Sequence, residues 1–161
     1  MPKSYTVPRG VTPTAIALFC DDPRIQDPVR EFLAGELGLA QGSCIPVVHP
    51  GGVAALSEPA KFPHEFAHLR DILGFYVRHF CSIHRIVLIN HQDCGKYKHL
   101  HTVLGSEFLN GFNQMEERHT QDVRVVGHAL PKDLEAHHLD VEQYYARFTD
   151  QGKTRIIFEK L

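Results

Sequence analysis

Two apolar runs, Thr14-Ala-Ile-Ala-Leu-Phe-Cys20 and Arg85-Ile-Val-Leu-Ile-Asn-His91, decide the fold that this sequence predicts. Each run has the length of a strand and contains an uninterrupted apolar stretch, at 15–19 and 86–89, which is typical of a strand buried on both faces of a parallel sheet. Each run also ends on a side chain that can bind a metal ion. Because the carboxyl ends of strands in an open α/β sheet line the crevice where ligands bind, we expect Cys20 and His91 to lie at the same edge.

The rest of the chain alternates between strand-like and helix-like patterns. Further strands are predicted at 44–49, 123–130 and 154–158 from short runs rich in apolar and β-branched residues. Helices are predicted at 27–37, 64–80, 100–112 and 139–148, where apolar residues recur on one helical face. This alternation predicts an α/β fold with a mostly parallel central sheet of four to five strands and helices on both faces.

The length of 161 residues is that of about one domain. Residues 1–13 contain three prolines and show little periodicity, so we interpret them as an N-terminal arm. We expect residues 14–161 to form a single domain. No repeat and no low-complexity tract divides this range.

The composition argues against several classes of partner. A formal charge of −2 and 22% charged residues leave no basic stripe for nucleic acid and no polybasic patch for a membrane. The N-terminus lacks the apolar core of a signal peptide, and no apolar stretch approaches the ~20 residues that span a bilayer. We therefore expect a cytoplasmic protein with a small-molecule substrate, whose four cysteines are reduced rather than paired in disulfides.

Cys94 lies three residues beyond His91 and completes a possible metal-binding set with Cys20. Two cysteines and one histidine form a donor set typical of zinc, and three protein ligands leave the fourth tetrahedral position open. An open position indicates catalysis more than a purely structural ion. Separately, Cys20 could be a buried apolar residue, His91 a hydrogen-bonded histidine and Cys94 a cysteine at a helix start, but their joint spacing favours the metal.

The segments Cys20-Asp-Asp-Pro-Arg24 and His91-Gln-Asp-Cys94-Gly95 match the Cys-x-Asp-x-Arg and His-x-x-Cys-Gly signatures of a known family. On these motifs the chain resembles the β-carbonic anhydrases over roughly residues 14–130. The resemblance implies Zn²⁺ held by Cys20, His91 and Cys94, with Asp22 and Arg24 as an ionic pair beside the open position. It also implies a homodimer or a higher homo-oligomer.

The resemblance further implies a lyase that reversibly hydrates CO2 to bicarbonate by means of a metal-bound hydroxide. Asp22 would orient the hydroxide, and Arg24 would keep Asp22 charged through a hydrogen-bonded ion pair. The weaker expectation of a substrate pocket falls on three glycines near the two motifs. These are Gly51, Gly52 and Gly95. His49 and His99 are candidates for proton export by position alone.

Other interpretations remain open at this point. The turn His49-Pro-Gly-Gly52 departs from the family's more usual Asn-Ala-Gly and leaves room for a related substrate such as CS2 or COS. A short arm and a short segment after Cys94 also allow a catalytically degenerate zinc-binding relative. Asp22 and Arg24 could be an ordinary surface ion pair. Finally, His64-Glu65-Phe-Ala-His68 satisfies the His-Glu-x-x-His signature of zinc proteases, although no third ligand is evident downstream.

Overall fold

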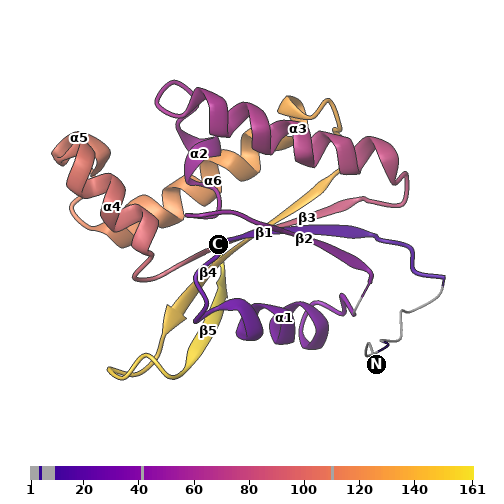
Figure 1. Cartoon of the computed structure of the whole chain (residues 1–161), viewed down its shortest axis with the longest axis horizontal. Helices are drawn as coiled ribbons and strands as arrows, with labels where there is room; N and C mark the ends of the chain where they lie inside the picture. Colours follow the sequence, from indigo (N-terminus) through magenta and orange to yellow (C-terminus); the bar gives the residue numbers. More distant parts are fainter. Residues whose placement is uncertain (1–3, 5–9, 41, 110) are drawn as a thin grey trace.

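A computed structural model describes residues 4, 10–40, 42–109 and 111–161 of the chain. Its centre is a five-stranded sheet with the strand order β2-β1-β3-β4-β5 (Figure 1). The pairs β2-β1, β1-β3 and β3-β4 are parallel, and β5 pairs antiparallel to β4. The strands are β1 (Ala15–Phe19), β2 (Cys44–Val48), β3 (Arg85–His91), β4 (Asp140–Phe148) and β5 (Ile156–Lys160). The predicted α/β class with a mostly parallel sheet is therefore confirmed.

Helices cover both faces of this sheet. In Figure 1, α1 (Gln26–Gly35) lies against one face, and α2 (Ala54–Ser57), α3 (Pro63–His79) and α6 (Met115–Asp133) lie on the other. Alternate side chains of β1 pack into two separate apolar clusters, one that includes Phe19 and Val29 of α1 and one that includes Leu18 and Leu73 of α3. Helices α4 (Gly95–Leu104) and α5 (Ser106–Leu109) follow β3 and extend beyond its carboxyl end.

The strand predicted at 123–130 is wrong, because these residues form the middle of helix α6. The buried residues Val123, Val126 and Leu130 recur at helical spacing and face the sheet. The helix begins eight residues earlier, at Met115, and most of its first turns are polar. Because several of these polar residues are buried, the apolar periodicity typical of a helix is not evident in the sequence. The segment after Cys94 is consequently a three-helix connection rather than a shortened loop.

The helix predicted at 139–148 is also wrong, because these residues form β4 between β3 and β5. Val141, Tyr144 and Tyr145 are residue types that favour strands, and β4 gains backbone hydrogen bonds from both neighbouring strands. The helix predicted at 100–112 begins earlier and is divided into α4 and α5 at Gly105. Gly105 has a φ of 60°, a left-handed conformation that glycine adopts readily at a helix end.

The strand register places the two metal-binding segments side by side. Phe19 of β1 is opposite Ile89 of β3 in a parallel pair, so Cys20 and His91 leave the sheet at the same edge. The predicted arm at 1–13 lies mostly outside the described residues, and the division of the chain into arm and domain stays a prediction. In the described ranges, no helix combines the length and apolar character that a membrane crossing requires.

Candidate metal centre

Cys20, His91 and Cys94 converge at the carboxyl edge of the sheet. All three side chains are buried, and their potential ligand atoms lie within 4.8 Å of one another. The Sγ atoms of Cys20 and Cys94 are 3.7 Å apart. Among the residues that the structure describes, no other group of three His, Cys, Asp or Glu side chains brings its ligand atoms this close.

This geometry fits a zinc ion. Two sulfur ligands at the usual Zn–S distance of about 2.3 Å lie about 3.8 Å apart in a tetrahedron, far longer than a disulfide bond. The Nδ1 atom of His91 lies 2.9 Å from the Gln92 carbonyl oxygen and can donate to it, which leaves Nε2 as the ligand nitrogen. That Nε2 is buried and has no hydrogen-bond partner. A bound metal ion would satisfy it.

Backbone N–H groups surround both sulfur atoms. Gly51 donates its N–H to Cys20 Sγ at 3.3 Å, from a turn in which Gly51 and Gly52 both have positive φ. Cys94 is the N-cap residue of α4, and the hydrogen bond from Cys20 together with backbone N–H groups of that helix lowers the pKa of the Cys94 thiol to about 7. In the same pair, the hydrogen bond with Cys94 and burial raise the pKa of Cys20. The site therefore favours one thiolate before any metal binds.

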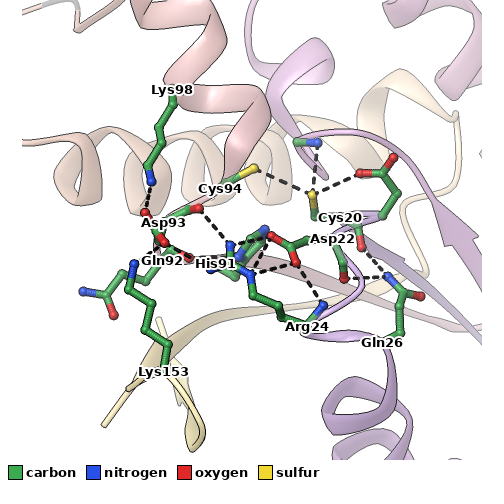
Figure 2. A network of polar contacts seen from close by, with 12 residues as sticks. Cys20, Asp22, Arg24, Gln26, His91, Gln92, Asp93, Cys94, Lys98 and Lys153 are labelled. Atoms are coloured by element: carbon green, nitrogen blue, oxygen red, sulfur yellow. Dashed lines mark hydrogen bonds and ion pairs between the residues drawn. The ribbon is translucent and has the colours of Figure 1, made fainter. Parts of the chain in front are cut away.

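Asp22 and Arg24 form a close ion pair beside these ligands (Figure 2). Arg24 donates from Nη2 to Asp22 Oδ2 at 2.6 Å, from Nε to both carboxylate oxygens, and from its backbone N–H to Oδ1. These hydrogen bonds hold the pKa of the Asp22 carboxyl below its usual range. Asp22 is thus directed toward Arg24 and does not belong to the cluster of ligand atoms.

Comparisons with solved structures identify this architecture. A β-carbonic anhydrase from Trichomonas vaginalis superposes with a TM-score of 0.58 at 13% identity, covering 98% of this chain and 87% of that one. A carbonic anhydrase from Streptococcus mutans gives 0.51 at 19% identity, with 97% and 87% covered. One of two tetrameric β-carbonic anhydrases from Sordaria macrospora gives 0.50 at 18% identity, with 94% and 82% covered.

The chain has the β-carbonic anhydrase fold. No family model and no curated protein matches the sequence. The resemblance that the two motifs suggest is therefore borne out at the level of the fold, in a chain that has diverged widely in sequence.

Within this fold, Asp93 is a residue of the site that the sequence motifs did not indicate. It accepts hydrogen bonds from Lys98 and Lys153, which approach it from opposite sides in Figure 2, and from Arg24 Nη1 at 3.1 Å. These bonds hold its pKa well below the ordinary range. Asp93 occupies a variable position between His91 and Cys94, and its φ of 64° shows the tightness of that turn.

Gln26 is a second unpredicted residue. Its Nε2 atom donates to the carbonyl oxygens of Cys20 at 2.8 Å and Asp22 at 3.2 Å, and so ties the loop after β1 to the start of α1. Both Gln26 and Asp93 act on residues of the motifs from positions that no motif specifies. A contact in three dimensions, rather than a sequence spacing, identifies them.

The remaining predicted residues differ in how closely they are packed and in how far they are buried. Gly52 packs so closely that a Cβ atom there would lie 2.6 Å from Asn90 Oδ1, whereas Gly95 at the start of α4 has open space around it. His49 is half-buried, and burial lowers its pKa, whereas His99 is exposed on α4.

A cavity of about 580 Å³ opens beside Cys94. Its lining includes Gln92, His119, Tyr145, Phe148 and Lys153.

The protease-like motif does not form a comparable site. His64 and His68 are exposed on the first turns of α3, and Glu65 pairs with Lys96 at 3.6 Å. Within the described part of the chain, none of these three residues belongs to a group of three potential metal ligands. Cys44 and Cys81 are free thiols away from the cluster, and all four cysteines are unpaired as expected.

Proposed function

We propose that this protein is a zinc-dependent carbonic anhydrase that reversibly hydrates CO2 to bicarbonate. The observation that carries the proposal is the 3.7 Å separation of Cys20 Sγ and Cys94 Sγ beside the unpartnered Nε2 of His91. That arrangement fits a tetrahedral ion with one open position. It occurs in the fold that this chain shares with the carbonic anhydrases from Streptococcus mutans and Trichomonas vaginalis.

Each residue of the site has a distinct role in this proposal. Cys20, His91 and Cys94 would hold the zinc, which would lower the pKa of a coordinated water molecule and so supply a nucleophile near neutral pH. Asp22, kept ionised by Arg24, would accept a hydrogen bond from the attacking water and orient it toward CO2. Since both Asp22 oxygens are engaged by Arg24, the same pair would also keep this carboxylate from occupying the open position.

The first test is metal content. The purified, reduced protein should contain about one zinc ion per chain by inductively coupled plasma analysis. Cys20→Ser should lose most of this zinc, because a hydroxyl is a poor replacement for a thiolate. Cys44→Ser, which changes a half-buried cysteine outside the cluster, should keep it. Equal zinc content in the two variants would contradict the ligand assignment.

The second test is activity. Stopped-flow measurement of CO2 hydration should show turnover in the zinc-loaded protein and in Cys44→Ser, and should show none above background in Cys20→Ser. A protein that is fully loaded with zinc but does not hydrate CO2 contradicts the proposed reaction. Sulfide release from CS2 or COS by the same sample would assign the site to those substrates, and inactivity on all three would indicate a binding protein.

The proposal extends to assembly. The two β-carbonic anhydrases from Sordaria macrospora are tetrameric. We expect this chain also to form a homodimer or a larger homo-oligomer. Light scattering coupled to size exclusion should give a multiple of the 18.2 kDa chain mass. A single chain mass at micromolar concentration would contradict this part of the proposal.

A further inference from the structure

A buried hydrogen-bond network lies on the side of the metal-ligand turn that faces the protein interior. Its centre is Asn90, which directly precedes His91 and is 2% exposed. Asn90 Nδ2 donates to the Tyr97 hydroxyl at 2.9 Å and to the His119 carbonyl oxygen at 3.2 Å. Its Oδ1 accepts from the Val53 N–H at 3.4 Å. One amide side chain therefore connects β3, α4, α6 and the turn before α2.

The network continues from Tyr97 into charged groups. The Tyr97 hydroxyl donates to Asp122 Oδ2 at 2.8 Å, and Arg118 Nε donates to the same oxygen at 3.0 Å. Arg118 also donates to Glu58 Oε1 at 2.7 Å and to the Phe108 carbonyl oxygen at 2.9 Å. Tyr97, Arg118 and Asp122 are all buried. Because buried polar groups are costly unless they are paired, this arrangement has few alternatives of equal energy.

The position of Tyr97 relates the network to the metal ligands. Tyr97 is three residues after Cys94 on α4, and Asn90 is one residue before His91, so their hydrogen bond closes a short segment that contains both ligands. The third ligand is connected through the glycine turn. Gly52 packs against Asn90 Oδ1, and Gly51 next to it donates to Cys20 Sγ.

We infer that Tyr97 is a positioning residue for the proposed zinc ligands, acting through its hydrogen bonds with Asn90 and Asp122. This inference rests on the proposed function, since it concerns the same three ligands. The hydroxyl fixes the distance between α4 and the end of β3, and thereby the distance between Cys94 and His91. Removal of a group that orients metal ligands without itself binding the metal commonly lowers metal affinity by about 10-fold to 100-fold.

A pair of matched variants tests this role. Tyr97→Phe removes a buried hydroxyl that donates to a carboxylate at 2.8 Å. Tyr144→Phe removes another buried hydroxyl that donates to a carboxylate at 2.8 Å, but its partner Glu142 pairs with Arg85 at the opposite end of β3 from His91. Each substitution removes one hydroxyl that donates to a carboxylate, but the Tyr97 hydroxyl also accepts from Asn90. We therefore expect both variants to lower the thermal midpoint of the metal-free protein, with the larger decrease in Tyr97→Phe.

Zinc affinity should distinguish the two variants. In competition with a chromogenic chelator, Tyr97→Phe should raise the zinc dissociation constant about tenfold, and Tyr144→Phe should leave it unchanged. After exchange of zinc for Co²⁺, the visible absorption bands, which report ligand geometry, should shift in Tyr97→Phe and match the wild type in Tyr144→Phe. A purely structural role for Tyr97 would not produce this difference.

The outcomes separate this inference from the proposed function. Equal zinc dissociation constants for Tyr97→Phe and the wild type, or equal losses of affinity in both tyrosine variants, overturn the positioning role. In those cases a zinc-loaded, active wild type leaves the proposed function standing. A wild-type chain that takes up no zinc overturns the proposed function, and the positioning role with it.

Discussion

Two polar clusters lie on opposite sides of the turn that carries His91 and Cys94, and they differ in almost every physical respect. We call them the front cluster and the rear network. The front cluster consists of Asp22, Arg24, Asp93, Lys98 and Lys153. The rear network consists of Glu58, Asn90, Tyr97, Arg118 and Asp122. Side chains of the front cluster reach solvent, with Lys98 60% exposed, whereas Arg118 of the rear network is 3% exposed.

The difference changes what each cluster can do. Hydrogen bonds from Lys153 and Lys98 lower the pKa of Asp93, whereas burial raises the pKa of Asp122 against the opposing influence of Arg118. In the front cluster, water screens the charges and the side chains can exchange partners at small cost. In the rear network, Asn90, Tyr97, Arg118 and Asp122 are buried, so no water can replace a partner lost from among them. The front is therefore suited to chemistry and the rear to fixing geometry.

The largest effect should come from breaking the rear network. Arg118→Met keeps most of the side-chain volume but leaves Asp122 buried without its cation, and leaves Glu58 with Lys61 alone. We expect the free energy of unfolding to fall by about 3–5 kcal/mol, which is typical of a broken buried ion pair. Urea unfolding followed by circular dichroism measures this change.

Arg30→Met is the matched control. Arg30 pairs with Asp27 at 2.9 Å on the surface of α1, with side chains that are 70% and 82% exposed. Its loss should cost no more than about 0.5 kcal/mol. Similar losses in the two variants would remove the contrast between buried and exposed charges on which the comparison depends.

The next largest effect should be on turnover and should come from the front cluster. Asp22→Asn keeps the shape of the side chain but removes the charge, and its amide can no longer accept in the same way from the reacting water. We expect kcat/KM for CO2 hydration to fall about 100-fold, in the range for a lost proton acceptor. Stability and zinc content should change little.

Asp27→Asn is the control, because it removes the charge of an exposed aspartate that pairs only with Arg30 in the described structure. This variant should retain full activity. An Asp22→Asn protein with wild-type kcat/KM would show that the front cluster is not catalytic. Asp22 and Arg24 would then be an ordinary surface ion pair, which is the alternative that the sequence left open.

The three proposed metal ligands, together with Asp22 and Arg24 of the front cluster, were easier to predict from sequence than the rear network, for a physical reason. Cys20, His91 and Cys94 end strands or begin a helix, so a short motif fixes their relative positions once the sheet forms. The hydrogen bond from Tyr97 to Asp122 joins residues that are 25 positions apart in sequence. These residues lie on two different helices, α4 and α6, and no local sequence pattern specifies how the helices pack. A buried tyrosine or aspartate looks the same in a sequence as an exposed one.

Buried charged side chains also account for the two errors in secondary structure. Helix α6 buries Arg118, His119 and Asp122 along with its apolar residues, so its apolar periodicity is interrupted in its first half. Its segment 123–130 contains three valines, and this local pattern predicts a strand. The strand β4 has the converse property, since Glu142 is buried within it and its apolar spacing imitates a helix. In both elements, a buried charge with a distant partner overrode the pattern.

A smaller effect should appear in the pH dependence of stability. The pKa of Asp93 is lowered in the folded protein, so this carboxyl binds fewer protons there than in the unfolded chain. Its stabilising contribution is complete above the ordinary aspartate pKa of about 4 and is lost as the pH falls through the lowered folded value. Asp93→Asn should therefore be less stable than the wild type at neutral pH, and the difference should shrink below about pH 4.

Urea unfolding of chelator-treated protein at a series of pH values measures this difference without the proton release that accompanies zinc binding. A gap between Asp93→Asn and the wild type that stays constant down to about pH 3 would show that the cations do not lower the pKa of Asp93.

The smallest effect should come from one cation at the edge of the front cluster. Lys153 lies in the loop between β4 and β5, is 45% exposed and pairs with Asp93. Because Arg24 and Lys98 also contact Asp93, Lys153→Ala should lower the free energy of unfolding by about 1 kcal/mol or less at low ionic strength. The difference should decrease further in about 1 M salt, where screening extends over about 3 Å. Urea unfolding at both salt concentrations measures it. If salt leaves the loss unchanged, or if the loss equals that of Arg118→Met, then the front cluster behaves as a buried network, and the division of labour between the two sides of the turn is wrong.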